Sequence, residues 1–443
     1  MKYLQKNKFL LTKSIFTFLI ISAFSAFVTK KGIMDTPPPK RPNIIIFYID
    51  DLGYGDIGYN GAEGVKTPVI DKLAKEGIVF TDAHSTAATC TPSRYSLLTG
   101  EYAFRNKAAI LPGDAPLLIK PGSFTLPSML KKAGYATGVV GKWHLGLGNG
   151  NINWNGHIKP GPSEIGFDYS FLLPATGDRV PTVYLENQRV LNANPNDPIE
   201  VSYELKLDGY HNGMDNPELL KQGADKQHSN TITNGISRIG YMKGGEKALW
   251  VDEEFPNVLK GRANQFINEH KDKPFFLFFS YHDIHVPRLP NKKFVGASTM
   301  GPRGDAIAQM DWVTGEVMNE IKKLGLDDNT IVIFTSDNGP VLNDGYEDEA
   351  VQLLSNHKPA GALRGGKYSA YEGGTRVPTI IRWTNKIKPQ VSNALVSQVD
   401  FYASLAALVN HKMADNEAID SENLWATFLG EKNTGRKYLL EES

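Results

Sequence analysis

"RPNIIIFYID", residues 41–50, is an unbroken series of β-branched and aromatic side chains that ends in an aspartate. A hydrophobic run without alternation is typical of a strand buried on both faces, as in sheets covered by helices on each side. The same pattern recurs in "TIVIFTSDNG" at residues 330–339, and a similar run stands in "PFFLFFSYHDIHVP" at residues 274–287. All three runs therefore predict buried strands of one sheet.

Segments with helical spacing alternate with these runs, at residues 68–77, 93–99, 126–133, 305–324 and 395–409. The alternation predicts a parallel or mixed α/β sheet flanked by helices, with its functional site at the carboxyl ends of the strands. Polar residues that follow the strands are expected to converge there: Asp50, Asp51, His282, His285, Asp337 and Asn338. Residues 148–261 are rich in Asn, Gly and Pro, and we interpret them as long insertions over the site rather than core.

The amino-terminal segment has the layout of a secretory signal peptide. Several lysines precede an apolar run at residues 15–28, and small residues at 23–25 offer a cleavage site. The run is shorter than the roughly 20 residues that a membrane span needs. We therefore expect residues 1–28 to be a cleaved signal peptide and the protein to be exported, periplasmic or extracellular, without a stable membrane anchor.

The charge balance bears on the class of partner, and the cysteine count bears on disulfides. The chain has 48 basic and 48 acidic side chains, so its zero net charge gives no electrostatic reason to expect nucleic acid as a partner. Cys90 is the single cysteine and cannot form an intramolecular disulfide. Considered alone, such a residue is most simply a small buried hydrophobic side chain.

Two adjacent carboxylates at the end of a strand, Asp50 and Asp51, repel each other unless a positive group joins them. Asp337 and Asn338 follow the matching strand and supply further oxygen ligands. Each pair alone is more often a turn or a helix cap, but placement after two matching buried strands favours a metal site. Oxygen ligands without sulfur suit a hard cation, Ca²⁺ or Mg²⁺, better than Zn²⁺.

Basic residues form a second set. "GKWHLG", residues 141–146, is expected to present Lys142 and His144 on the same side of an extended segment. "RGGKYSAYEGGTRVP", residues 364–378, carries Lys367 in a glycine-rich loop that can approach a ligand closely. Such donors around a divalent metal describe a pocket for a tetrahedral oxyanion, either phosphate or sulfate.

The segment "CTPSR" at residues 90–94, followed by "LTG" at 98–100, resembles the signature of the type I sulfatases, the formylglycine-dependent branch of the alkaline phosphatase superfamily. Five further motifs, "NIIIFYIDDLGYGD", "GKWHLG", "HDIHVP", "SDNG" and "GGKYSAYEGGTRVP", stand in the family's order between residues 43 and 378. The resemblance implies a catalytic domain over residues 41–410 with a large mixed, mostly parallel sheet. Residues 411–443 would be the start of a truncated or reduced C-terminal region, too short for the family's small antiparallel subdomain.

The resemblance also implies the chemistry at residue 90. Cys90 would be converted to formylglycine by a formylglycine-generating or anaerobic sulfatase-maturating enzyme, which reads Pro92 and Arg94. One hydroxyl of the formylglycine hydrate would attack sulfur, and the other would later expel sulfate by hemiacetal collapse. One calcium ion would be held by residue 90 together with Asp50, Asp51, Asp337 and Asn338.

The remaining family roles fall on basic residues. Arg94 would fix the diol, and His144 would take the proton of its non-attacking hydroxyl. Lys142 and Lys367 would clamp the sulfate. His285 would contact the sulfate and the leaving-group oxygen, although His282 stands three residues upstream and remains open for that role.

The expected substrate is a sulfate ester on a terminal sugar of a sulfated polysaccharide. Asp178 and Arg179 are the candidate substrate-binding residues, for sugar hydroxyls and a second anionic group, with Arg288 and His211 as weaker candidates. Three alternatives stay open: a phosphate or phosphonate ester hydrolase on the same scaffold, a non-catalytic calcium-dependent sulfated-glycan-binding protein, and a purely structural secreted domain.

Overall fold

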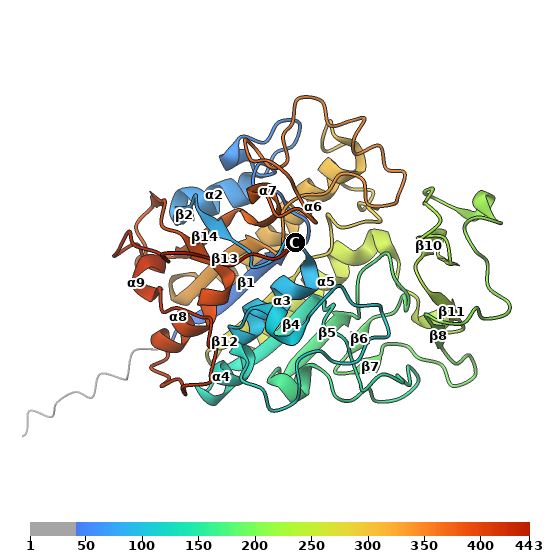
Figure 1. Ribbon diagram of the computed structural model, residues 1–443, viewed down its shortest axis with the longest axis horizontal. Helices are drawn as coiled ribbons and strands as arrows, with labels where there is room; N and C mark the ends of the chain where they lie inside the picture. The colour runs from blue at the N-terminus through green and yellow to red at the C-terminus, as the bar shows by residue number, and fades with distance from the viewer. Residues whose placement is uncertain (1–40) are drawn as a thin grey trace, which may run out of the picture. The chain divides into compact units, whose positions relative to one another are not determined.

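A mixed ten-stranded sheet forms the centre of the protein, as Figure 1 shows for the computed structural model, which describes residues 41–443. The predicted signal peptide over residues 1–28 lies outside the described residues. In spatial order the strands are β15 (Gln390–Ser392), β2 (Ile78–Phe80), β14 (Thr379–Trp383), β13 (Thr330–Ser336), β1 (Asn43–Ile49), β12 (Phe275–Ser280), β4 (Ala136–Lys142), β5 (Tyr169–Leu173), β6 (Leu185–Glu186) and β7 (Arg189–Val190).

The five strands from β13 to β5 run parallel, and the sheet continues through antiparallel pairings on both sides, with β15 parallel to β2 at one edge. Strand β1 lies between β13 and β12, and every one of its residues is buried. The three apolar runs are thus neighbouring core strands, which confirms the predicted α/β class with a large, mostly parallel sheet. Their β-branched and aromatic side chains have helices on both faces to bury them.

Alternate residues of β1 enter two separate hydrophobic cores. Ile44 and Ile46 pack on the side of α3 (Cys90–Thr99), α4 (Leu126–Lys132), α8 (Phe401–Leu408) and α9 (Trp425–Phe428). Ile45 and Phe47 pack on the side of α2 (Pro68–Glu76), α5 (Phe255–His270) and α6 (Gly301–Lys323). The period of two along the strand therefore divides the helices into two layers. The short helix α7 (Glu372–Thr375) lies in the glycine-rich loop.

Residues 148–261 were expected to lie outside the core, and this expectation is wrong in part. Strands β5, β6 and β7 come from this stretch and extend the central sheet. The other strands of the insertion are short antiparallel pairs: β8 (Glu200–Ser202) with β11 (Tyr241–Lys243), and β9 (Thr231–Thr233) with β10 (Ile236–Arg238). Strands of two to five residues are too short to produce a clear period in the sequence.

The C-terminal stretch 411–443 contains α9 and loops, and no antiparallel subdomain is present within it. It packs against the segment that precedes α3. Glu442 exchanges backbone hydrogen bonds with Thr86 and Ala88, and the Arg436 guanidinium pairs with buried Asp400 at 2.7 Å. A further two-stranded pair, β3 (Ala83–His84) with β16 (Val396–Ser397), lies beside this contact.

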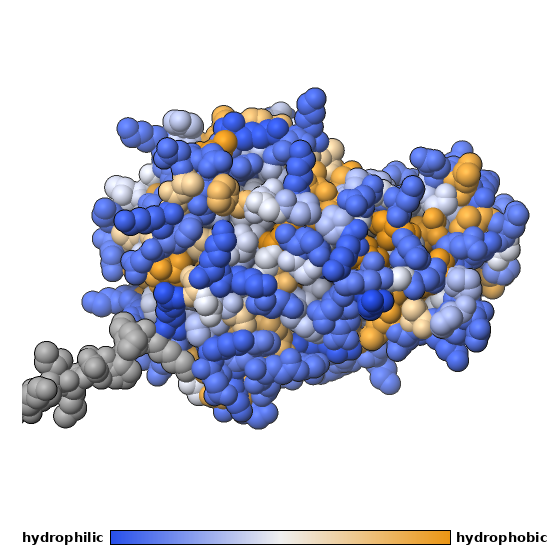
Figure 2. Space-filling view, turned by 90° about the horizontal axis from the view of Figure 1, so that it is seen from below, coloured by the Kyte–Doolittle hydropathy of each residue, from blue (hydrophilic) through white to orange (hydrophobic). Residues whose placement is uncertain are grey.

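One face of the protein is mainly polar (Figure 2). Figure 2 shows a face on which hydrophilic residues predominate and hydrophobic residues gather in small separate patches. In residues 41–443 we find no helix with the length and apolar content that crossing a bilayer requires.

Candidate active site

Two pairs of buried oxygen-bearing side chains lie side by side at the carboxyl ends of β1 and β13. Parallel register sets Ile49 beside Ser336, so the residues that follow each strand are adjacent. The amide of Asn338 donates to Asp51 Oδ1 at 2.8 Å, and the backbone N–H of Asp51 donates to Asp337 Oδ1 at 3.2 Å. Asp50, which precedes Asp51, is equally buried. The site therefore follows from the register of two strands.

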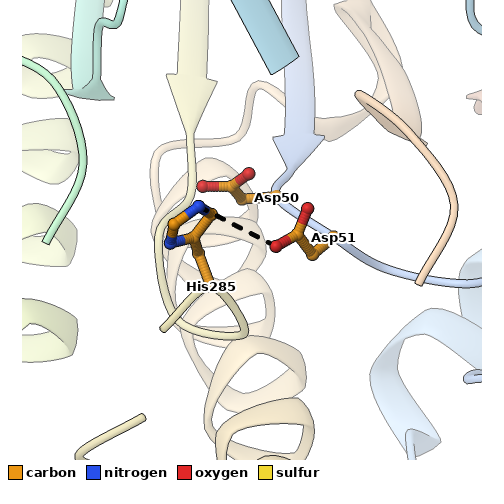
Figure 3. Close-up of side chains that lie close together, drawn as sticks. All are labelled: Asp50, Asp51 and His285. Carbon is orange, nitrogen blue, oxygen red and sulfur yellow. Dashed lines mark ion pairs between the residues drawn. The ribbon is translucent and has the colours of Figure 1, made fainter. Parts of the chain in front are cut away.

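His285 joins this group from the loop after β12. Figure 3 shows the carboxylates of Asp50 and Asp51 facing the ring of His285, and their ligand atoms lie within 4.8 Å of one another. His285 Nε2 lies 3.9 Å from Asp51 Oδ2, while Nδ1 lies 2.7 Å from the carbonyl of Val286. Burial, with Lys367 and Lys142 close by, holds the pKa of His285 well below its usual value. Its ring is therefore neutral at neutral pH and presents Nε2 to the site.

Helix α3 brings Cys90 and Arg94 to the same place. The helix begins at Cys90, three residues before the predicted start, because Pro92 in the first turn gives up no intrahelical hydrogen bond. Arg94 follows one turn later on the same face. Its guanidinium donates to Asp337 Oδ2 at 2.7 Å and lies 3.8 Å from Asp50 Oδ1, and a third contact goes to the Ser280 hydroxyl.

His144 lies against the sulfur of residue 90. Its Nδ1 is 3.2 Å from Cys90 Sγ, and its Nε2 is 2.9 Å from the carbonyl of Leu111. A carbonyl can only accept, so Nε2 carries the hydrogen and Nδ1 has a free lone pair toward Cys90. Burial, with Lys142 nearby, lowers the pKa of His144 well below its usual value. The backbone of His144 has φ 52°, so the residue lies in a left-handed turn after β4 and not in the expected extended segment.

Two lysines pair with the carboxylates of the site. Lys142 ends β4 and its Nζ lies 2.6 Å from Asp50 Oδ2. Lys367 Nζ lies 2.9 Å from Asp51 Oδ2 and 3.1 Å from Asp344 Oδ2. The loop of Lys367 comes so close that a Cβ on Gly339 would lie 1.8 Å from a backbone oxygen of this loop. Only glycine fits that approach.

Two oxygens at the centre of the site are buried without a hydrogen-bond partner. They are Asp50 Oδ1 and Asn338 Oδ1. A buried polar atom without a partner is costly, and a carboxylate oxygen more so. Burial raises the pKa of Asp50 well above its usual value, Lys142 opposes this rise, and Asp337 and Asp51 add to it. A cation bound here would satisfy both oxygens and favour the ionised carboxylates.

Asp178 and Arg179 lie on the other side of the site, in a turn after β5. Arg179 Nη1 lies 2.7 Å from Asp178 Oδ2, and His228 Nε2 lies 3.7 Å from the same oxygen. Although burial raises the pKa of Asp178, the Arg179 guanidinium and His228 hold it well below its usual value. Asp178 is buried and Arg179 largely so, which distinguishes this pair from a solvated surface ion pair.

The structure distinguishes between the weaker candidates. His282 Nε2 accepts a hydrogen bond from the Gly177 backbone, and burial lowers the pKa of His282 to about 3. Arg288 is fully buried and already engaged, because its guanidinium pairs with Asp348 and donates to three backbone carbonyls. His211 is exposed, and among the described residues its side chain has no hydrogen bond to the site. Of the two histidines in "HDIHVP", His285 is the one with a ring nitrogen turned to the carboxylates.

Asp344 and His228 are site neighbours that the sequence did not indicate. Both line a cavity of about 760 Å³ formed by residues 224–228 and 342–352. Asp344 contacts Lys367, and His228 contacts Asp178. Two residues of the cavity wall therefore touch residues of the candidate active site. Each residue stands in an irregular loop, and no motif or period marks it.

A mixed α/β sheet that gathers carboxylates, basic side chains and one thiol at the carboxyl edge of its parallel strands is characteristic of the alkaline-phosphatase-like hydrolases. The chain belongs to the sulfatase family of that superfamily: residues 42–411 match the family described as "Sulfatase". It is a sulfuric ester hydrolase.

Known relatives agree in both sequence and structure. An N-acetylgalactosamine-6-O-sulfatase of Bacteroides thetaiotaomicron is 52% identical over 406 residues, which cover 91% of this chain and 80% of the relative. Human arylsulfatase A is 32% identical, with 90% of this chain and 70% of the relative covered. A solved sulfatase structure, titled for glycosaminoglycan metabolism by Bacteroides thetaiotaomicron, superposes with a TM-score of 0.89 at 52% identity and covers 90% of this chain and 84% of that one.

Proposed function

We propose that the protein is an exported carbohydrate sulfatase that uses formylglycine at residue 90 and one calcium ion. The observation that carries this proposal is the position of Cys90. Its sulfur lies at the first turn of α3, 3.2 Å from a histidine nitrogen and beside a buried cluster of carboxylates and lysines.

The unmodified thiol is poorly suited to be the nucleophile. Burial raises the pKa of Cys90, although Lys142 and Lys367 oppose this rise. The thiol is therefore protonated at neutral pH and weakly nucleophilic. Formylglycine at this position would supply a hydrated aldehyde, with one hydroxyl for attack and one for release of sulfate. The modifying partner would be a formylglycine-generating or anaerobic sulfatase-maturating enzyme.

The donor set fits calcium. Asp50, Asp51, Asp337 and Asn338 offer only oxygen atoms, and two of these oxygens are buried without a partner. A hard cation such as Ca²⁺ prefers this set. When bound, it would offset the carboxylate charge and polarise a sulfate oxygen.

The remaining residues have separable tasks. His144 Nδ1, with its lone pair toward residue 90, accepts a proton there. Arg94 is locked between Asp337 and Ser280 and holds the carboxylates in place. Lys142 and Lys367 bind sulfate oxygens, and His285 Nε2 faces the leaving oxygen. Because Nδ1 donates to the Val286 carbonyl in the neutral ring, Nε2 has to take up a proton when the anionic substrate binds before it can pass one to the leaving oxygen.

The substrate we propose is a terminal sugar that carries a sulfate ester. Because the 52% identical relative is named for N-acetylgalactosamine 6-O-sulfate, this sugar is the first to test. Asp178 and Arg179 would bind its hydroxyls or a second anionic group, since they form a short ion pair and Asp178 lies near His285.

Export and domain limits are part of the same proposal. Residues 1–28 would direct the chain to the periplasm or the exterior, and residues 41–410 would form the catalytic domain. The family match over residues 42–411 supports these domain limits. Residues 411–443 would form a reduced C-terminal region.

One experiment tests the proposal. The protein is produced with and without a maturating enzyme, the peptide that contains residue 90 is analysed by mass spectrometry, and release of sulfate from 6-sulfated N-acetylgalactosamine is measured. We expect turnover only in preparations that carry the aldehyde, and inhibition by a calcium chelator. Turnover by wholly unmodified thiol protein would contradict the formylglycine assignment, and faster hydrolysis of the matched phosphate ester would favour the alternative hydrolase.

A further inference from the structure

Tyr368, directly after Lys367, has a backbone conformation that residues with a Cβ seldom adopt. Its φ is 70°, in the left-handed region. The surrounding loop holds it there, because the backbone N–H of Tyr368 donates to the carbonyl of Ala88 at 2.9 Å, two residues before Cys90. A disfavoured conformation kept by a bulky residue beside an active site is a reason to examine the task of its side chain.

Contacts on two sides fix the ring of Tyr368. Its hydroxyl donates to Asp344 Oδ2 at 3.2 Å, and the ammonium of Lys367 lies 5.2 Å from the ring centroid. The same ammonium contacts Asp51 at 2.9 Å. Lys367 therefore links the ring of Tyr368 to the carboxylate cluster.

The phenol lies among the charged groups at the edge of the site, beside Asp344 and Lys367. Burial raises the pKa of Tyr368, Lys367 opposes this rise, and the charges of Asp344, Asp51 and Cys90 add to it. Groups act on one another in this way only over short distances. Even so, half of the residue is exposed, at 50%. It is a fixed aromatic ring at the mouth of the site.

We infer that Tyr368 is a platform against which the sugar ring that bears the sulfate packs; this rests on the proposed carbohydrate substrate. The faces of an aromatic ring carry partial negative charge and attract the polarised C–H bonds of a pyranose. The hydrogen bond from the hydroxyl to the Asp344 carboxylate makes the ring more electron-rich and strengthens this attraction. Stacking would hold the sugar while Lys367 binds its sulfate.

Tyr371 in the same loop provides a matched comparison. It is exposed to the same degree, at 49%, but the Arg364 guanidinium lies over its ring at 3.9 Å from the centroid. The Lys367 ammonium is farther from the Tyr368 ring, at 5.2 Å, so a sugar on the covered face of Tyr371 would have to displace the closer contact. We therefore expect Tyr371 to have no part in binding.

The test uses formylglycine-containing enzyme and two substrates that carry the same sulfate ester, cyclic 6-sulfated N-acetylgalactosamine and its reduced, open-chain alditol 6-sulfate. Tyr368→Ala is expected to lower kcat/KM on the cyclic sugar roughly 10-fold, mainly through KM, and on the alditol less than about 2-fold. Tyr368→Phe keeps the ring and should stay within about 3-fold of wild type on both substrates. Tyr371→Ala should leave both unchanged.

Inhibition by inorganic sulfate reports separately on the pocket around Lys367. If Tyr368→Ala weakens this inhibition, or reduces activity equally on both substrates, the residue acts through Lys367 and the platform is wrong. An unchanged KM on the cyclic sugar also overturns it. If the wild type fails on this sugar, the proposed substrate is wrong; the same variants and controls are then compared on a cyclic sulfated sugar that it hydrolyses and on its alditol, where the same outcomes decide.

Discussion

The two sides of the active site are built by different means. The proposed sulfate side is centred on residues at the carboxyl ends of parallel core strands, so strand register positions Asp51, Asn338 and Lys142. The proposed glycan side, with Asp178, Arg179 and the cavity beside them, consists of loops, from the insertion over residues 148–261 and from residues 342–352. On this proposal the chemistry would depend on the sheet, whereas the choice of sugar would depend on segments that can vary without disturbing it.

Removal of the side chain at position 90 should have the largest effect. We expect Cys90→Ala to reduce turnover roughly 10⁴-fold or more on every sulfate ester, because no nucleophile remains on the sulfate side. Sulfate release and thermal unfolding are measured together. Since the side chain is small, Tm should stay close to that of wild type. Substantial activity in this variant would mean that another group attacks sulfur.

The next prediction compares the two carboxylates that share Lys367. Asp51→Asn should lower activity roughly 10³-fold and weaken calcium binding, because it removes a charged ligand. Asp344→Asn removes the other partner of Lys367 and is expected to cost less than about 10-fold, with calcium binding unchanged. Calorimetry and elemental analysis measure the metal. Equal losses of activity in both variants would indicate that Asp51 acts by holding Lys367 and not by binding a metal.

A smaller effect, limited to one substrate class, is expected on the glycan side. Asp178→Ala and Arg179→Ala should each lose roughly 100-fold in kcat/KM on the sulfated sugar while retaining activity on a small aryl sulfate. The ratio of the two specificity constants is the measurement. Parallel losses on both substrates would show that the pair supports the sulfate pocket and would remove the distinction between the two sides.

The smallest effect concerns the framework behind the site. Buried His84 lies 2.7 Å from Glu441 and 3.1 Å from Asp82. Burial lowers the pKa of His84, but these two carboxylates outweigh it and raise the pKa above its usual value. A raised pKa stabilises the fold below the unfolded pKa of about 6.5, and this contribution is lost as pH rises through the folded pKa.

We therefore expect His84→Gln to lower Tm by roughly 1 to 2 °C at pH 6 and by less at pH 9, without an effect on sulfate hydrolysis. Thermal unfolding at the two pH values checks the sign. A larger loss at pH 9 than at pH 6 would show that the neutral ring is the stabilising form.

The contrast between core strands and loops also explains which parts of the fold and the site could be predicted from the sequence. The long apolar runs made β1, β12 and β13 predictable, and parallel strands end at one edge, so the convergence of Asp50, Asp51, Asp337 and Asn338 followed. By contrast, β6 and β7 have two residues each and leave no period to detect. Arg288 was a plausible substrate ligand until its partner, Asp348, was seen 60 positions away. Contacts between irregular loops leave no such pattern.

Burial at the start of α3 has a consequence for the timing of maturation. Residues 90–94 are all buried, with Cys90 at 2% exposure, and the chain closes over them through Glu442 and Tyr368. An enzyme that oxidises this thiol, as we propose, would have no access to the segment in the folded protein. The proposed modification would therefore have to precede folding, while the chain is being made or moved. Molecules that folded first would keep the thiol, so the relative rates of modification and folding would set the active fraction of a preparation.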